Sequence, residues 1–88
     1  MKVSLQVAER LRALHPGVRK DIRRALDDLD RGKQRDVRAL RMPLAGYYRL
    51  RVGKYRVILR FDTATGAIRA EFLERRESAY KSFTNPER

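Results

Sequence analysis

The sequence has 88 residues with 22 Lys or Arg against 11 Asp or Glu, and its net charge of +11 favours nucleic acid, an acidic protein or a membrane surface as partner. A hydrophobic fraction of 42% supports one globular domain over residues 1–88. The absence of cysteine excludes disulfides and thiolate metal sites, and a single histidine excludes metal sites built on several imidazoles. We therefore expect no metal and no cofactor. No apolar run approaches the ~20 residues that span a bilayer, and we expect a cytoplasmic protein.

The N-terminal third is predicted to form a short strand and a helical hairpin. Residues 2–5 have extended character, and apolar residues at helical spacing predict a first helix over about residues 6–14. A His-Pro-Gly break at 15–17 separates it from a second helix, whose apolar stripe from 18 to 29 ends before Gly32. We expect the two helices to lie antiparallel to each other and to pack on a sheet through their apolar stripes.

A β-hairpin is the strongest local signal in the chain. Residues 33–42 are polar and cationic and are predicted to connect the helices to this hairpin. The hairpin strands, 47–52 and 55–61, alternate apolar with polar residues and are rich in β-branched and aromatic side chains. The Gly-Lys pair at 53–54 suits a type II′ turn, because that turn takes glycine at its first central position.

The turn fixes which side chains share a face of the hairpin. Counting from it places Arg51 opposite Arg56 and makes one face apolar, with Tyr48, Leu50, Val52, Tyr55, Val57, Leu59 and Phe61. The other face carries Arg49, Arg51, Arg56 and Arg60. Like charges directly opposite on a sheet cost stability, so this face is expected to meet an anion. The alternative is a solvated basic surface, which is what most charge runs are.

A third antiparallel strand is predicted over residues 67–73, after a loop at 62–66. Alternation assigns to the apolar face Ile68, Ala70 and Phe72. It assigns to the arginine face Arg69, Glu71, Leu73 and Arg75. A short turn or helix is expected over residues 78–83. The predicted fold class is therefore α+β, in which an N-terminal strand and a helical hairpin pack on an antiparallel sheet in the order β-α-α-β-β-β.

The segment 44–58, Leu-Ala-Gly-Tyr-Tyr-Arg-Leu-Arg-Val-Gly-Lys-Tyr-Arg-Val-Ile, resembles the signature hairpin of the RelE/ParE toxin superfamily. The resemblance extends over nearly the whole chain, from the first helix to residues 74–80. It implies a small RelE-like (microbial-RNase-like) fold and the toxin of a type II toxin–antitoxin pair. In the RelE branch such toxins are ribosome-dependent mRNA endonucleases, or mRNA interferases, which inhibit translation. The implied partners are a cognate antitoxin, the ribosome and mRNA.

The resemblance also implies functional residues. It assigns catalytic roles to Arg49, Arg51, Arg56, Arg75 and Tyr80. The further cations expected to bind RNA are Lys54, Arg60 and Arg69. Arginines bind phosphate well, but a guanidinium hardly gives up its proton, so the general base must be another group. The carboxylate candidates are Glu71 and Glu74, and each could instead be a salt-bridge partner. Leu73-Glu74 stands where the family often has Gly-His, which leaves the acid–base assignment open.

Two other functions remain alternatives. ParE-like relatives share the scaffold and inhibit DNA gyrase, a protein-binding activity without a catalytic constellation. A plain nucleic-acid-binding module would use the charge alone. The arginine cluster together with Tyr80 favours the nuclease, because an inhibitor has no need of that convergence.

Overall fold

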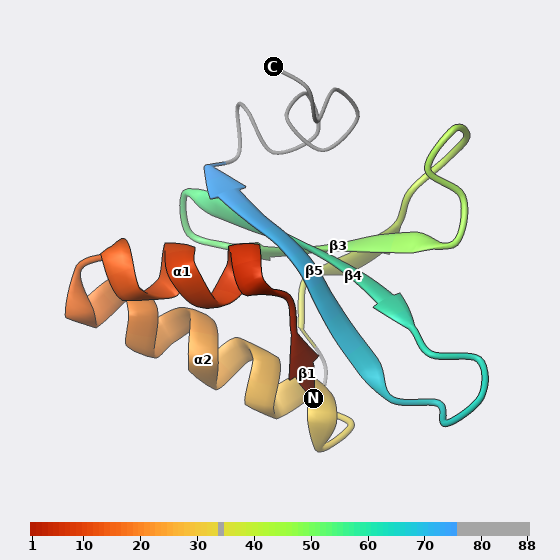
Figure 1. Ribbon diagram of the computed structural model, residues 1–88, viewed down its shortest axis with the longest axis horizontal. Coiled ribbons are helices and arrows are strands. Elements are labelled where there is room, and N and C mark those ends of the chain that lie inside the picture. Colours follow the sequence, from red (N-terminus) through yellow and green to blue (C-terminus); the bar gives the residue numbers. More distant parts are fainter. Residues whose placement is uncertain (34, 76–88) are drawn as a thin grey trace.

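The computed structural model describes residues 1–33 and 35–75, and Figure 1 shows a helical hairpin on one face of a β-sheet. The helices are α1 (Leu5–Ala13) and α2 (Pro16–Asp30). The strands are β1 (Lys2–Val3), β2 (Val37–Ala39), β3 (Tyr47–Val52), β4 (Tyr55–Phe61) and β5 (Ile68–Arg75). The order in the five-stranded sheet is β1-β5-β4-β3-β2, with β1 parallel to β5 and the other neighbours antiparallel. The predicted α+β class, with an N-terminal strand and a helical hairpin packed on a sheet, is confirmed, but the sheet contains one strand more than the predicted order β-α-α-β-β-β.

Side-chain caps begin both helices. Ser4 Oγ accepts a hydrogen bond from the backbone N–H of Val7 (3.2 Å) and donates one to the carbonyl oxygen of Glu71 (2.7 Å), which ties the start of α1 to β5. His15 Nδ1 accepts a hydrogen bond from the N–H of Gly17 (3.1 Å) at the start of α2. The single histidine of the chain therefore caps the second helix in the bend between the two.

The core lies between the helices and the sheet. Its buried apolar residues come from both layers and are Val7, Leu11, Ile22, Ala25, Leu26, Leu50, Val57, Leu59, Ala70 and Leu73. The apolar stripes predicted for the two helices thus face the sheet. Phe61, predicted for the same face, lies at the end of β4 with 46% of its surface exposed and packs edge-on against Tyr48, with ring centroids 5.1 Å apart.

The N-terminal part of α1 continues the edge of β5 beyond the two residues of β1. Gln6 Nε2 donates to the carbonyl oxygen of Leu73 (2.9 Å), and Gln6 Oε1 accepts from the N–H of Leu73 (2.8 Å). One helical turn later, Arg10 Nη2 binds Glu74 Oε1 at 2.7 Å. The side-chain amide of Gln6 thus pairs with the backbone N–H and carbonyl oxygen of Leu73, as the backbone of a neighbouring strand would. This pairing holds α1 in a fixed position against β5.

The hairpin has the predicted register. β3 and β4 pair Val52 with Tyr55 and Arg51 with Arg56, and the remaining pairs follow in step. Gly53 has φ 57°, and no described non-glycine residue has a positive φ. Because a type I′ turn would need a positive φ at Lys54 as well, this turn is the predicted type II′.

A β-bulge in β5 overturns the alternation predicted for its second half. Leu59 pairs with Ala70, but the neighbouring Ile58 pairs with Phe72, so Glu71 is an extra residue on β5. The alternation therefore shifts by one after Glu71. Phe72, predicted for the core, lies on the arginine face, and the side chain of Leu73, predicted for that face, is fully buried in the core.

The same shift corrects the position of Arg75. Register places it opposite Tyr55, so Arg75 does not share the arginine face, whereas Glu74, opposite Arg56, does. A bulge depends on how two strands meet, and nothing in the local alternation of apolar and polar residues announced it.

The sequence prediction also missed a strand. β2 spans only Val37–Ala39, inside the stretch assigned to a connecting loop, and it forms the sheet edge beside β3. Its pattern is too short and too polar to predict a strand on its own. Backbone pairing with β3 stabilises it, and the N–H of Arg51 extends this pairing to the carbonyl oxygen of Asp36 (3.0 Å).

Candidate functional site

The sheet face opposite α1 and α2 is organised in cross-strand rows. Read from the β2 edge towards β5, the rows are Arg38-Arg49-Ile58-Phe72, Arg51-Arg56-Glu74 and Tyr47-Arg60-Arg69. We call this surface the cationic face and define it by its arginines, Arg38, Arg49, Arg51, Arg56, Arg60 and Arg69. Of the predicted site residues, the structure brings together on this face Arg49, Arg51, Arg56, Arg60, Arg69, Glu71 and Glu74.

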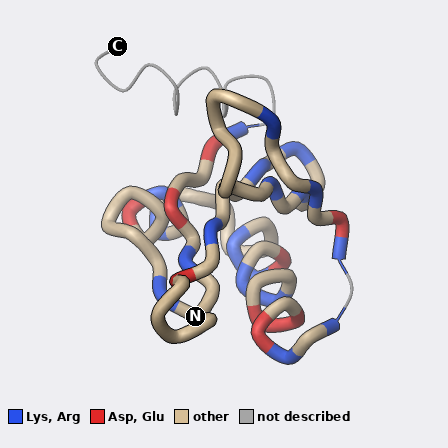
Figure 2. The backbone as a smooth tube through the Cα atoms, turned by 90° about the vertical axis from the view of Figure 1, so that its right-hand side faces the viewer, with Lys and Arg blue, Asp and Glu red and all other residues tan. Residues whose placement is uncertain are grey.

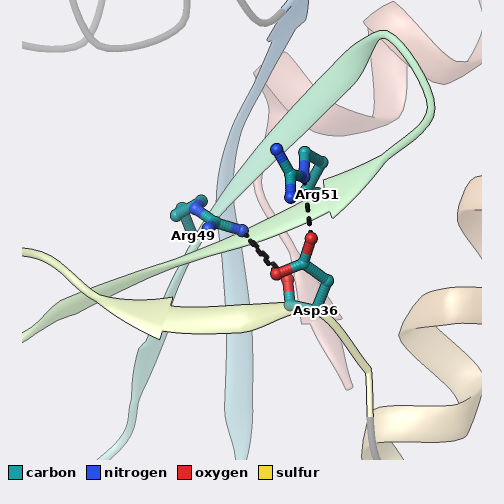
Figure 3. A network of polar contacts seen from close by, with 3 residues as sticks. All are labelled: Asp36, Arg49 and Arg51. Atoms are coloured by element: carbon teal, nitrogen blue, oxygen red, sulfur yellow. Dashed lines mark hydrogen bonds and ion pairs between the residues drawn. The ribbon is translucent and has the colours of Figure 1, made fainter.

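Asp36, just before β2, holds the two arginines of β3 (Figure 3). Its Oδ1 accepts from Arg49 Nη1 at 2.9 Å, and its Oδ2 accepts from Arg51 Nε at 2.7 Å. Arg49 Nη1 also contacts the Asp36 carbonyl oxygen at 3.3 Å. One carboxylate therefore orients both guanidinium groups, each of which keeps further N–H donors for another anion.

These contacts lower the pKa of Asp36 from the ordinary 3.8 to about 2. The first cause is the hydrogen bond from Arg49, followed by the hydrogen bond from Arg51, because both favour the charged carboxylate. Asp36 is consequently ionised at neutral pH. A carboxylate with so low a pKa is a weak base, so its role at the site is to orient the arginines.

The centre of the cationic face is apolar and well packed. Ile58 is fully buried although it lies on the side away from the main core, between Arg49 and Phe72 in its row. Arg49 itself is only 7% exposed. A charge buried to this extent needs a partner, and Asp36 supplies it. Arg49 is therefore positioned as firmly as a core residue.

The two predicted carboxylate candidates both take part in ion pairs. Glu71 Oε1 lies 3.1 Å from Arg69 Nε and 3.5 Å from Arg60 Nε. Glu74 Oε1 binds Arg10 of α1 at 2.7 Å. Both glutamates therefore form salt bridges with arginines, which was one of the two roles that the sequence left open for them.

The remaining predicted residues lie elsewhere. Lys54 is exposed in the β3–β4 turn, and Arg75 ends β5 opposite Tyr55, away from the cationic face. Tyr80, and the turn or helix expected over residues 78–83, lie outside the described residues. Residues 1–33 and 35–75 contain no cluster of three or more His, Cys, Asp or Glu that could hold a metal ion.

Sequence reasoning missed two contributors from β2 and its approach, Asp36 and Arg38. A signal for Asp36 was available, because it is the only acidic residue between Asp30 and Asp62, within a stretch that holds ten Lys or Arg. An isolated acid in such a stretch is well placed to bridge several cations. Arg38 could not be found without the strand pairing that sets it beside Arg49.

Basic positions occur over helices, strands and loops, with acidic positions between them along the helices (Figure 2). The segment from 31 to 61 differs, since its cations face a single acid. The excess positive charge is therefore concentrated on the β2–β4 half of the protein. No helix in the described ranges is both long and apolar enough to cross a membrane.

Two crystal structures of toxin–antitoxin complexes contain a chain with this architecture. The match to the RelBE2 complex of Mycobacterium tuberculosis has a TM-score of 0.72 and 26% sequence identity, over 85% of this chain and 94% of that one. The match to the RelB–RelE complex of Methanococcus jannaschii has a TM-score of 0.74 and 20% identity, over 94% of this chain and 99% of that one. The chain has the fold of RelE toxins. Neither a protein-family model nor a curated protein sequence matches the RelE-like chain.

The cationic face of the RelE-like chain is suited to binding phosphate. Guanidinium groups stay charged at any physiological pH and can donate two parallel hydrogen bonds to phosphate oxygens. Arg51 and Arg56 lie side by side across β3 and β4, and two neighbouring guanidinium groups can bind the oxygens of one phosphate. The ion pairs of Asp36 and Glu71 hold the surrounding guanidinium groups in place.

Proposed function

We propose that this chain is the toxin of a type II toxin–antitoxin pair and that it cleaves mRNA on the ribosome. The observation that carries the proposal is the convergence of arginines from four strands on the sheet face opposite the helices. The RelE fold and the 26% identity to the chain of the RelBE2 complex support the same function. The proposed substrate is single-stranded mRNA, and the proposed location is the cytoplasm.

The reaction would be attack of an RNA 2′-hydroxyl on the neighbouring phosphate. The attack needs a base for the hydroxyl proton, stabilisation of the charge at phosphorus and an acid for the leaving oxygen. Arg51 and Arg56 are the residues we assign to charge stabilisation, with Arg49 held behind them by Asp36. Arg60, Arg69 and Lys54 would bind the flanking backbone.

The described carboxylates of the cationic face are poorly suited to be the acid and base of this reaction. Asp36 is too weak a base, and Glu71 and Glu74 are engaged with arginines. The resemblance assigns roles to Arg75 and Tyr80, and a tyrosine can donate a proton or stack on a base. Binding of the ribosome, which would place the reacting groups in line, supplies the rest of the rate enhancement in this scheme.

A cognate antitoxin is the second proposed partner. The two matched crystal structures are complexes of a toxin with its antitoxin. A chain with a net charge of +11 is complemented by an acidic segment, and one with an amphipathic stripe would fold as it wraps the toxin. Covering the cationic face or displacing the segment that carries Tyr80 would block cleavage.

One experiment tests the nuclease assignment. The chain is induced in cells, and the 5′ ends of mRNA fragments are mapped against ribosome-protected codons, with a gyrase supercoiling assay in parallel. The proposal requires new ends inside codons held by the ribosome and unchanged supercoiling. Intact ribosome-bound mRNA during full growth arrest would overturn it.

Inhibition of DNA gyrase, as in ParE-like relatives, is the second candidate. Its support is that each acidic residue of the cationic face is bound to arginine, so no described side chain there is available as a base. An inhibitor would need such a surface only for contact. Loss of supercoiling activity without mRNA cleavage in the same experiment would favour this function.

A further inference from the structure

A cavity of about 340 Å³ lies beside the cationic face, between β2, the loop that follows it and the start of β3. Its walls come from residues 38–44 and from Arg49. This volume is within the range of pockets that bind small ligands, which is about 300–1,000 Å³. Because Arg49 belongs to both, the cavity is continuous with the cationic face.

The loop that forms the cavity is held by backbone hydrogen bonds. The N–H of Leu40 donates to the carbonyl oxygen of Tyr47 (2.9 Å), and the N–H of Tyr47 donates to that of Leu44 (3.1 Å). The N–H of Leu44 in turn donates to the carbonyl oxygen of Arg41 (2.8 Å). In Figure 1 this loop projects beyond the sheet at the upper right. Its cavity is thus formed by a folded loop at the rim of the cationic face.

Charge around the cavity has one sign. Arg38, Arg41 and Arg49 line it, and no acidic residue does. Asp36 is the partner of Arg49, whereas neither Arg38 nor Arg41 forms an ion pair within the described part of the chain. Arg38 also lies directly opposite Arg49 in the strand pairing, so the two guanidinium groups are neighbours at the edge of the cavity.

The rest of the lining is apolar, which a site for a bare anion would not need. Met42 is 80% exposed and stands beside Pro43 in the same loop. Methionine adapts its flexible side chain to varied apolar surfaces, and guanidinium planes stack on nucleobases. A ligand that matches both parts of the lining carries a phosphate and a flat, largely apolar ring.

We propose that this cavity is a nucleotide subsite for single-stranded RNA, in which Arg38 and Arg41 bind a phosphate and Met42 contacts the adjoining base. The subsite rests on the proposed RNA function and deepens it. It would bind the nucleotide next to the phosphate on the Arg51–Arg56 pair and so fix the RNA along the sheet. Base preference at that position would then be set by the loop after β2.

Binding of a fluorescent single-stranded RNA hexamer to the full chain tests this subsite. Arg38→Gln removes one cation from the cavity, and Arg24→Gln removes one from the exposed surface of α2. Met42→Gln removes an apolar contact without changing the charge, and Leu5→Gln does the same at a residue of α1 that is 71% exposed. The variants and their controls thus match in charge and in exposed apolar surface.

We expect Met42→Gln to weaken RNA binding at least about fourfold, the value that corresponds to burying one methylene group, and Leu5→Gln to leave it unchanged. Arg38→Gln should reduce the slope of log affinity against log salt by about 0.7, the value for one phosphate contact to a single strand, whereas Arg24→Gln should not. Folding of each variant is verified by circular dichroism. Equal affinities for the cavity variants and their controls would overturn the subsite.

Inorganic polyphosphate serves as a probe without bases. If Met42→Gln lowers the affinity for RNA but not for polyphosphate, Met42 contacts a base. If it lowers both affinities equally, the base contact is overturned. The nuclease proposal fails separately. If the cavity variants bind RNA more weakly but no ribosome-bound mRNA is cut, the subsite is supported and the nuclease assignment is overturned. If ribosome-bound mRNA is cut and the cavity variants bind RNA normally, the nuclease assignment is supported and the subsite is overturned.

Discussion

Arg49 and Asp36 form an ion pair in which the arginine is almost wholly buried and the carboxylate is partly open to solvent, with Nη1 and Oδ1 2.9 Å apart. Arg51 shares the same carboxylate. An internal anion thus occupies part of the hydrogen-bonding capacity of two cations that we assign to the phosphate site. Asp36 both orients the arginines and lowers the positive charge that a substrate meets.

The first prediction concerns Asp36→Asn. The variant should melt at a lower temperature, because Arg49 would be left buried with a weaker partner. It should also bind single-stranded RNA more tightly, because one negative charge has left the cationic face. Asp21→Asn on the exposed surface of α2 is the matched control for charge. A melting temperature equal to that of the control would show that Arg49 does not depend on Asp36.

The second prediction is the titration of Asp36. A folded pKa of about 2, below the ordinary 3.8, means that the Asp36 contribution to stability is fully present above pH 4 and is lost as the pH falls towards 2. NMR of the side-chain carboxyl carbon should give a midpoint near 2 for the native chain. In Arg51→Gln the midpoint should move up towards the ordinary value. A midpoint near 3.8 in the native chain would contradict the ion pairs.

A third prediction concerns the arginine at the centre of the proposed site. Arg56→Ala should abolish growth inhibition on induction, because the Arg51–Arg56 pair that we assign to charge stabilisation would lose one of its two guanidinium groups. Arg24→Ala, on α2, should stay toxic. The catalytic role of Arg75 rests on the resemblance alone. If Arg75 has that role, induction of Arg75→Ala should no longer inhibit growth, as for Arg56→Ala. A folded but fully toxic Arg56→Ala would remove it from the active site.

The fourth prediction concerns the core. Leu59→Ala should lower the free energy of unfolding by roughly 2–5 kcal/mol, because Leu59 is 1% exposed and its truncation leaves a cavity. Phe61→Ala, two residues along the same strand face and half-exposed, should cost much less. Urea denaturation measures both. If the two variants lost equal stability, Leu59 would not lie in the core of the folded chain.

The hairpin could be predicted because its determinants are local. Strand alternation and glycine at position 53 together specify both the turn type and the register, and every predicted β3–β4 pair is present. The helices were equally accessible, since their apolar stripes and the break at residues 15–17 lie within one segment each. The arginines of β3 and β4 followed from the same alternation.

What could not be predicted depends on contacts between distant segments. β2 exists because β3 offers it a partner, and so the positions of Arg38 and Asp36 follow from pairing. The bulge at Glu71 likewise reflects how β5 fits both β4 and the start of α1. Alternation extrapolated along β5 was therefore right up to Ala70 and wrong beyond Glu71.

The bulged residue links the two sides of the sheet mechanically. The carbonyl oxygen of Glu71 is held by Ser4 at the start of α1, and its carboxylate is held by Arg60 and Arg69 on the cationic face. A force applied to the start of α1 would thus be transmitted through Glu71 to guanidinium groups on the opposite surface. A protein that binds to and shifts α1 would pull the Glu71 carboxylate with it and change the spacing of those cations without touching them.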